Sequence, residues 1–105
     1  MDCIAVLVWL WQHGPGANIN GVYNLGTGKA RSFLDLMNAV GGACGAAPII
    51  EFIEMPPEIR SSYQYLTQAR TSRLREIGYN APFTTLEEAV GDYVIRYLSQ
   101  SDPYL

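Results

Sequence analysis

The feature that most constrains this chain is an uninterrupted run of nine apolar residues near its start, residues 3–11. A membrane-spanning helix needs about 18 or more apolar residues. A secretory signal peptide needs a basic segment where this chain has acidic Asp2. Asp2 is a good N-cap, so we expect a helix over residues 2–11 that ends near Gly14. Such a helix has no polar face, so either another part of a larger protein or a second copy of the chain must cover it.

The composition is that of one small domain, which we expect to span residues 1–105. The chain is 49% hydrophobic and has a formal net charge of −3. Seven Lys and Arg residues against ten Asp and Glu residues form no basic patch, which argues against a nucleic-acid partner. The two cysteines, Cys3 and Cys44, and the single histidine, His13, indicate neither a disulfide framework nor a metal site. Reduced thiols are typical of a cytoplasmic protein.

The middle of the chain alternates between strand and helix patterns. Residues 21–25 and 49–53 are short apolar runs typical of buried strands, and the apolar residues between them recur at helical spacing. Ser32, with Asp35 three residues later, predicts the N-terminal cap of this helix. Glycines crowd its end, so we expect the helix to stop early or to fray there. Strand, helix and strand in this order predict an α/β fold built on a small parallel βαβ unit.

Two more helices complete the predicted fold. Residues 71–78 form a short helix that ends at a glycine. Thr84 and Glu87 form a predicted capping box for a C-terminal helix. Apolar residues at helical spacing over residues 86–98 make this last helix amphipathic.

Residues 26–29 form a glycine-rich turn that partly resembles the phosphate-binding loops of nucleotide-binding proteins. A dinucleotide-binding fingerprint needs glycine at position 31, where Arg31 stands, and a P-loop needs Ser or Thr at position 30, where Ala30 stands. The pattern therefore favours a tight turn over a phosphate loop. The Tyr-x-x-x-Lys pair of short-chain dehydrogenases is also missing, because the one lysine, Lys29, has Leu25 four residues before it.

Residues 60–65 contain the candidate binding residues. They follow the predicted strand 49–53 and a Pro-Pro break, and ligands of open α/β sheets bind beyond the carboxyl ends of strands. Arg60 suits a phosphate, and Tyr63 suits a hydroxyl group of a ribose or sugar. A loop aromatic that packs on the edge of the domain fits the same pattern.

Three stretches of sequence are more specific: GVYNLGTGKARSFLDLMNAV, IEFIEMPPEIRSSYQYLTQA and LREIGYNAPFTTLEEAVGDYV. They resemble the C-terminal part of the ADP-L-glycero-D-manno-heptose 6-epimerases, which are extended short-chain dehydrogenase/reductase enzymes that act on nucleotide sugars. YNLGTG alone is typical of many nucleotide-sugar epimerases and dehydratases. The combination with PPEIRxxYQYLTQA and LREIGY is specific to the heptose branch, and the resemblance covers essentially the whole chain.

The resemblance implies an NADP-dependent isomerase in which a Rossmann domain, absent from this chain, holds the cofactor and the catalytic residues. The chain then corresponds to the substrate domain and has no catalytic, cofactor-binding or metal-binding residue of its own. Tyr63 matches a substrate contact of the family, and Arg60 matches a position that is often basic. Arg70 and the glycine pair 41–42 depart from the family pattern.

Two functional hypotheses follow from this resemblance. In the first, the chain is a truncated, nucleotide-sugar-binding part of an epimerase that is inactive alone. In the second, it is a decayed or repurposed part of such an enzyme that acts as a self-associating module. The expected partners are an ADP-linked sugar, bound weakly, and a second copy joined through helix 2–11 in a homodimer, with no membrane contact.

Overall fold

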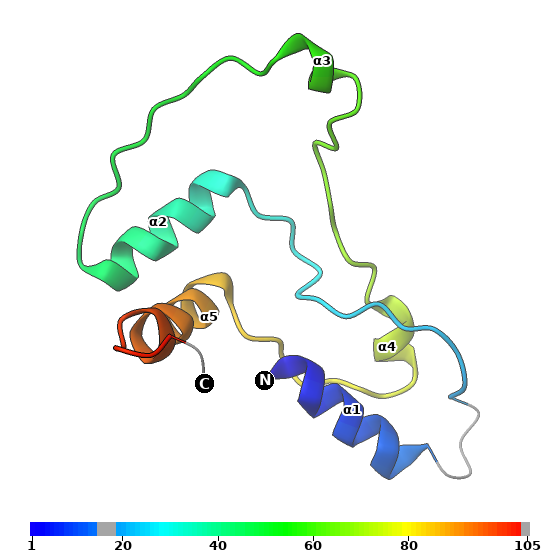
Figure 1. The fold of residues 1–105 in the computed structure, drawn as a ribbon. Coiled ribbons are helices and arrows are strands. Elements are labelled where there is room, and N and C mark those ends of the chain that lie inside the picture. The colour runs from blue at the N-terminus through cyan, green and yellow to red at the C-terminus, as the bar shows by residue number, and fades with distance from the viewer. Residues whose placement is uncertain (15–18, 104–105) are drawn as a thin grey trace. The chain divides into compact units, whose positions relative to one another are not determined.

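A computed structural model describes residues 1–14 and 19–103, which form helices joined by irregular segments (Figure 1). The elements in chain order are α1 (Asp2–His13), α2 (Phe33–Cys44), α3 (Pro57–Arg60), α4 (Ser72–Glu76), α5 (Leu86–Tyr93) and a π-helical turn, η1 (Val94–Leu98). The chain packs as two compact units. One comprises Met1–Lys29 and Gln68–Thr84, and the other comprises Ala30–Thr67 and Thr85–Leu105. The expected single domain over residues 1–105 stays a prediction.

The predicted parallel βαβ unit is wrong. Residues 21–25 and 49–53 have no regular secondary structure, and the structure contains no strand in residues 1–14 or 19–103. In the second segment the side chains of Ile49, Phe52 and Ile53 are 102%, 81% and 83% exposed. A pair of strands is marginal in water without further strands or a packed apolar face. The described chain is therefore helical rather than α/β.

The first unit has a small core formed by α1 and by residues 74–83. Its fully or nearly buried side chains are Val6, Leu74 and Tyr79. Partly buried apolar side chains pack around them: Trp9, Leu10, Tyr23, Ile77 and Phe83. Burying one large apolar side chain contributes about 1.5–3 kcal/mol, so this cluster stabilises the first unit.

A pair of hydrogen bonds joins the two ends of the first unit. The Asp2 carboxylate accepts them from the backbone nitrogen and the hydroxyl of Thr84, at 2.8 and 2.7 Å. The prediction that Asp2 is the N-cap of α1 is wrong, because Met1 has that position and Asp2 lies in the first turn. The helix itself contains all of the predicted range 2–11.

In the second unit α2 packs against α5 and η1. The predicted cap of α2 is confirmed: Ser32 Oγ accepts a hydrogen bond from the Asp35 backbone, and the Asp35 carboxylate accepts one from the Ser32 backbone. The prediction that α2 stops early is wrong. The helix runs through its glycines to Cys44 and ends at Gly45, whose φ of 69° lies in the left-handed region.

The C-terminal helix begins one residue later than predicted. Its capping box is made by Thr85 and Glu88 instead of Thr84 and Glu87. The hydroxyl of Thr84 is bonded to Asp2, so the next threonine takes the capping position. In residues 1–14 and 19–103, no helix is both long enough and apolar enough to cross a lipid bilayer.

Candidate functional site

The two predicted substrate-binding residues lie on either side of one bend in the second unit. Pro57 begins α3, where its fixed φ and missing N–H favour the first helical position. Arg60 is the last residue of this short helix. A turn follows, closed by a hydrogen bond of 3.1 Å from the Ser62 nitrogen to the Ile59 carbonyl oxygen, and Tyr63 comes directly after it.

A second aromatic ring orients Tyr63. The rings of Tyr63 and Tyr65 meet edge-on, with centroids 5.2 Å apart and an interplanar angle of 72°. An edge-on aromatic pair stabilises its conformation by about 0.5–1.5 kcal/mol, in addition to the contribution of the apolar surface it buries. Gln64, which lies between the two tyrosines in the sequence, donates from Nε2 to the Leu66 carbonyl oxygen at 3.2 Å. Tyr63 is 39% exposed and Tyr65 is 74% exposed, so both rings can be reached from solvent.

The polar ends of Arg60 and Tyr63 are available to a ligand. Arg60 is exposed, and within the described residues neither its guanidinium nor the Tyr63 hydroxyl has a hydrogen bond or ion pair. A guanidinium can bind a phosphate through two parallel N–H groups, and a phenol can donate and accept. The bend does not lie at the carboxyl end of a strand, because residues 49–53 are not a strand.

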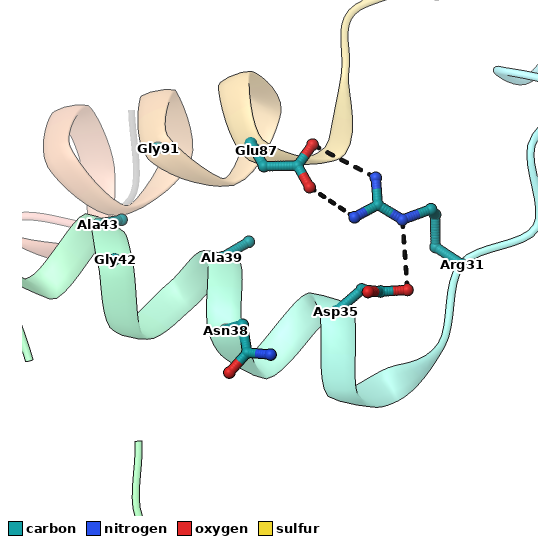
Figure 2. Close-up of a pocket in the computed structure, with 8 residues that line it drawn as sticks. All are labelled: Arg31, Asp35, Asn38, Ala39, Gly42, Ala43, Glu87 and Gly91. Atoms are coloured by element: carbon teal, nitrogen blue, oxygen red, sulfur yellow. Dashed lines mark hydrogen bonds and ion pairs between the residues drawn. The ribbon is translucent and has the colours of Figure 1, made fainter. Parts of the chain in front are cut away.

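A pocket that the sequence analysis missed lies between α2 and α5 (Figure 2). It has a volume of about 360 Å³, and its lining combines small residues with a polar end: Arg31, Asp35, Asn38, Ala39, Gly42, Ala43, Glu87 and Gly91. The small residues of α2 recur at spacings of three and four, which places them on one helix face. That spacing is the sequence signal from which the hollow could have been predicted.

The charged groups at the polar end of this pocket satisfy one another. Arg31 Nη1 and Nη2 donate to the two Glu87 carboxylate oxygens at 3.3 and 2.5 Å, and Nε donates to Asp35 at 3.3 Å (Figure 2). Hydrogen bonds from Ser32 lower the pKa of Asp35, and hydrogen bonds from Arg31 lower the pKa of Glu87. Both carboxylates are ionised at neutral pH, so neither is suited to proton transfer there. The cluster joins α2 to α5.

The glycine-rich turn does not fit the nucleotide cofactor that the resemblance implies. The Gly28 carbonyl oxygen accepts a hydrogen bond of 2.5 Å from Gln68, and the Thr27 hydroxyl accepts one of 3.2 Å from the Lys29 nitrogen. A phosphate loop would present its groups to the start of the following helix. That start is already capped by the Asp35 carboxylate, which repels an anion. These contacts are those of a structural turn.

The remaining reactive side chains form no cluster. Among residues 1–14 and 19–103, no three His, Cys, Asp or Glu side chains come together as metal ligands would. Cys3 and Cys44 are exposed free thiols. His13 stacks on Trp9, with ring centroids 4.3 Å apart, and its Nδ1 lies 2.8 Å from the Trp9 carbonyl oxygen.

Comparison with known proteins shows what the chain is similar to. No protein-family model matches it. Over 104 residues, 99% of the chain, it is 48% identical to a protein of Nitratidesulfovibrio vulgaris (strain Hildenborough) named ADP-L-glycero-D-manno-heptose-6-epimerase. Over 92 residues, 82% of the chain, it is 46% identical to a protein of the same name from Fusobacterium nucleatum subsp. nucleatum. The chain is homologous to these epimerases.

The homology confirms the resemblance carried by the three sequence stretches. The chain spans 31% of the length of the N. vulgaris epimerase and 28% of the length of the F. nucleatum epimerase. Most of each epimerase therefore has no counterpart in the chain. The roles of Arg60 and Tyr63 in binding stay predictions.

Proposed function

We propose that this chain is the nucleotide-sugar-binding part of an ADP-heptose epimerase and contacts an ADP-linked sugar through Arg60 and Tyr63. The observation that carries the proposal is the 48% identity over 99% of the chain to a protein named ADP-L-glycero-D-manno-heptose-6-epimerase. In this assignment the Arg60 guanidinium binds the diphosphate. The Tyr63 hydroxyl binds a hydroxyl group of the ribose or the sugar.

The geometry of the bend supports this assignment. Arg60 and Tyr63 are separated by a two-residue turn, and their polar ends have no partner within the described chain. The edge-on contact with Tyr65 limits the movement of the Tyr63 ring, which reduces the entropy lost when a ligand binds. The two side chains thus offer one cation and one neutral hydroxyl to an anionic sugar nucleotide.

The chain by itself should bind weakly and should not catalyse epimerisation. A ligand loses translational and rotational freedom when it binds, and this loss costs free energy. Contacts with only two side chains offset little of that cost. We therefore expect a dissociation constant for ADP on the order of 1 mM. Its sequence has neither the Tyr-x-x-x-Lys pair nor the dinucleotide fingerprint, so catalysis would require residues outside it. We assign it to the cytoplasm, where its exposed thiols would stay reduced.

The test compares ADP affinities of the whole chain and four variants by equilibrium titration. Arg60→Ala and Tyr63→Phe should each weaken binding about threefold to tenfold, which is the usual effect of losing one hydrogen-bonding group. The matched controls are Arg96→Ala, an exposed arginine paired with Asp92 at 2.8 Å, and Tyr65→Phe. Equal weakening in a control and in its matched variant would refute the assignment.

A further inference from the structure

The ring of Tyr65 lies next to the assigned ligand site, yet the proposed function gives it no part in binding. The ring is 74% exposed, against 39% for Tyr63, and the centroids of the two rings are 5.2 Å apart. This contact places the two side chains on the same side of the chain. A ligand held by Tyr63 therefore lies within reach of the Tyr65 ring.

The edge-on contact leaves a face of the Tyr65 ring free. At an interplanar angle of 72°, the edge of one ring meets the face of the other. The contact therefore covers at most one of the two faces of Tyr65, and the high exposure of the residue shows that the remainder is open within the described residues. An open aromatic face is the surface on which proteins stack nucleic-acid bases.

The side chains of the bend occur in the same order as the groups of a nucleotide. In ADP the diphosphate is joined to the ribose, and the ribose is joined to the base. In the proposed function Arg60 binds the diphosphate, and Tyr63, after a two-residue turn, offers its hydroxyl. Tyr65 follows with an aromatic face. Adenine is flat and uncharged, so an aromatic face suits it, whereas a cation suits the diphosphate and a hydroxyl suits the ribose.

We propose that the Tyr65 ring stacks on the adenine base of the ADP-linked sugar, next to the ribose that Tyr63 binds. This inference rests on the proposed function and extends it: a third residue recognises the base, and the partner of Tyr63 is the ribose rather than the second sugar. Stacking recognises a base by its flat surface and needs no hydrogen bond to it. The ring therefore favours a nucleotide over a sugar phosphate that has no base.

The test compares ADP with ribose 5-phosphate, which keeps a phosphate for Arg60 and ribose hydroxyls for Tyr63 but has no base. Each ligand is titrated into the full chain, and the shifts of backbone amides in residues 59–64 give its affinity. Tyr65→Leu should weaken ADP binding about fivefold, the smaller end of the effect of losing one base–aromatic stack. It should leave the affinity for ribose 5-phosphate unchanged. Tyr65→Phe keeps the ring and should bind ADP as the wild-type chain does.

Tyr93→Leu is the matched control. Tyr93 is another exposed tyrosine of the second unit, and its ring also pairs with a tyrosine, Tyr97, at 5.7 Å between centroids. Its replacement should not change ADP binding. The adenine protons H2 and H8 give a second measurement, because a stacked aromatic ring shields them. They should move upfield on binding to the wild-type chain and to Tyr65→Phe, and not on binding to Tyr65→Leu.

The outcomes separate this inference from the function on which it rests. Equal weakening of both ligands by Tyr65→Leu would overturn it, because Tyr65 would then act only by orienting Tyr63. ADP binding that does not respond to Tyr65→Leu, or that responds equally to Tyr93→Leu, would overturn it as well. In these cases the proposed function still stands if Arg60→Ala and Tyr63→Phe weaken ADP binding. An absence of ADP binding at residues 59–64 would overturn both.

Discussion

The carboxylate of Asp2 accepts two hydrogen bonds from Thr84, a residue 82 positions away, at 2.8 Å from its nitrogen and 2.7 Å from its hydroxyl. This one side chain connects the first turn of α1 to the end of the segment Gln68–Thr84 that completes the first unit. The hydroxyl and the backbone N–H of Thr84 both lower the pKa of Asp2. The contact therefore links the folding of the first unit to pH.

Replacing Asp2 with Asn should destabilise the first unit. The amide is uncharged and has an NH2 donor in place of one of the two acceptor oxygens, so it cannot accept both hydrogen bonds from Thr84. We expect the free energy of unfolding to fall by about 1 kcal/mol in urea denaturation. Asp92→Asn is the control. It removes the same charge from an exposed pair with Arg96, 2.8 Å apart, and should change stability by less than about 0.5 kcal/mol. Equal effects of the two substitutions would contradict this account.

The stabilisation by Asp2 should also depend on pH in one direction. The pKa of Asp2 in the folded chain is lowered below its ordinary value of 3.8, so the folded state favours the ionised form. The difference in stability between the wild-type chain and Asp2→Asn should therefore be constant above pH 3.8 and disappear as the pH falls through the folded-state pKa. Urea denaturation of both proteins at several pH values measures this difference, and a difference that grows at low pH would contradict the prediction.

The core of the first unit should be sensitive to truncation at Leu74. This side chain is fully buried, so Leu74→Ala should cost about 2–4 kcal/mol through lost burial and a cavity. Leu98, which is 53% exposed, is the control, and Leu98→Ala should cost much less. Tryptophan fluorescence during denaturation reports the loss through Trp9, which packs against this core. Similar losses for the two variants would show that Leu74 is not a core residue in solution.

Arg31 should hold α2 and α5 together in the second unit. Because it donates to both Asp35 and Glu87, Arg31→Ala leaves two carboxylates facing each other without a cation. We expect faster amide hydrogen exchange in α2 of the variant. The difference from the wild-type chain should shrink in about 1 M salt, where charges are screened over roughly 3 Å. Exchange rates that do not respond to the substitution would show that the cluster does not stabilise the pair of helices.

The chain by itself should not bind NADP or NADPH. Its glycine-rich turn uses its polar groups for bonds within the first unit, and the start of α2 is already capped by a carboxylate. Fluorescence titration with NADPH should show no saturation. Saturable binding with a dissociation constant near about 1 μM would contradict this reading of the turn.

Local signals in the sequence predicted most helix positions correctly. The Ser32–Asp35 capping box and the helical spacing after it place α2, and the ranges 2–11 and 71–78 overlap α1 and α4. These features depend on residues within one or two helical turns of one another, which a sequence displays directly.

Features that depend on contacts between residues far apart in the sequence could not be predicted from local sequence patterns. The bond from Thr84 to Asp2 moves the cap of α5 by one residue, and the sequence does not show which residues meet. A strand exists only when it is paired, so the apolar runs 21–25 and 49–53 could not establish a sheet by themselves. For the pocket between α2 and α5, the spacing of small residues on α2 is a local signal, whereas the contact with α5 that completes the pocket is a distant one. Arg60 and Tyr63 were predicted to lie beyond the end of a strand, which is wrong because residues 49–53 are not a strand, and the binding role of the two residues needs a direct test.

The most direct test of the proposed function is an NMR titration of the isotopically labelled full chain with ADP. The account predicts shift changes of backbone amides that cluster in residues 59–64, half-saturate at a concentration on the order of 1 mM and weaken in Arg60→Ala. Changes that cluster elsewhere, at the α2–α5 pocket for example, or no change at all at saturating ADP, would contradict it.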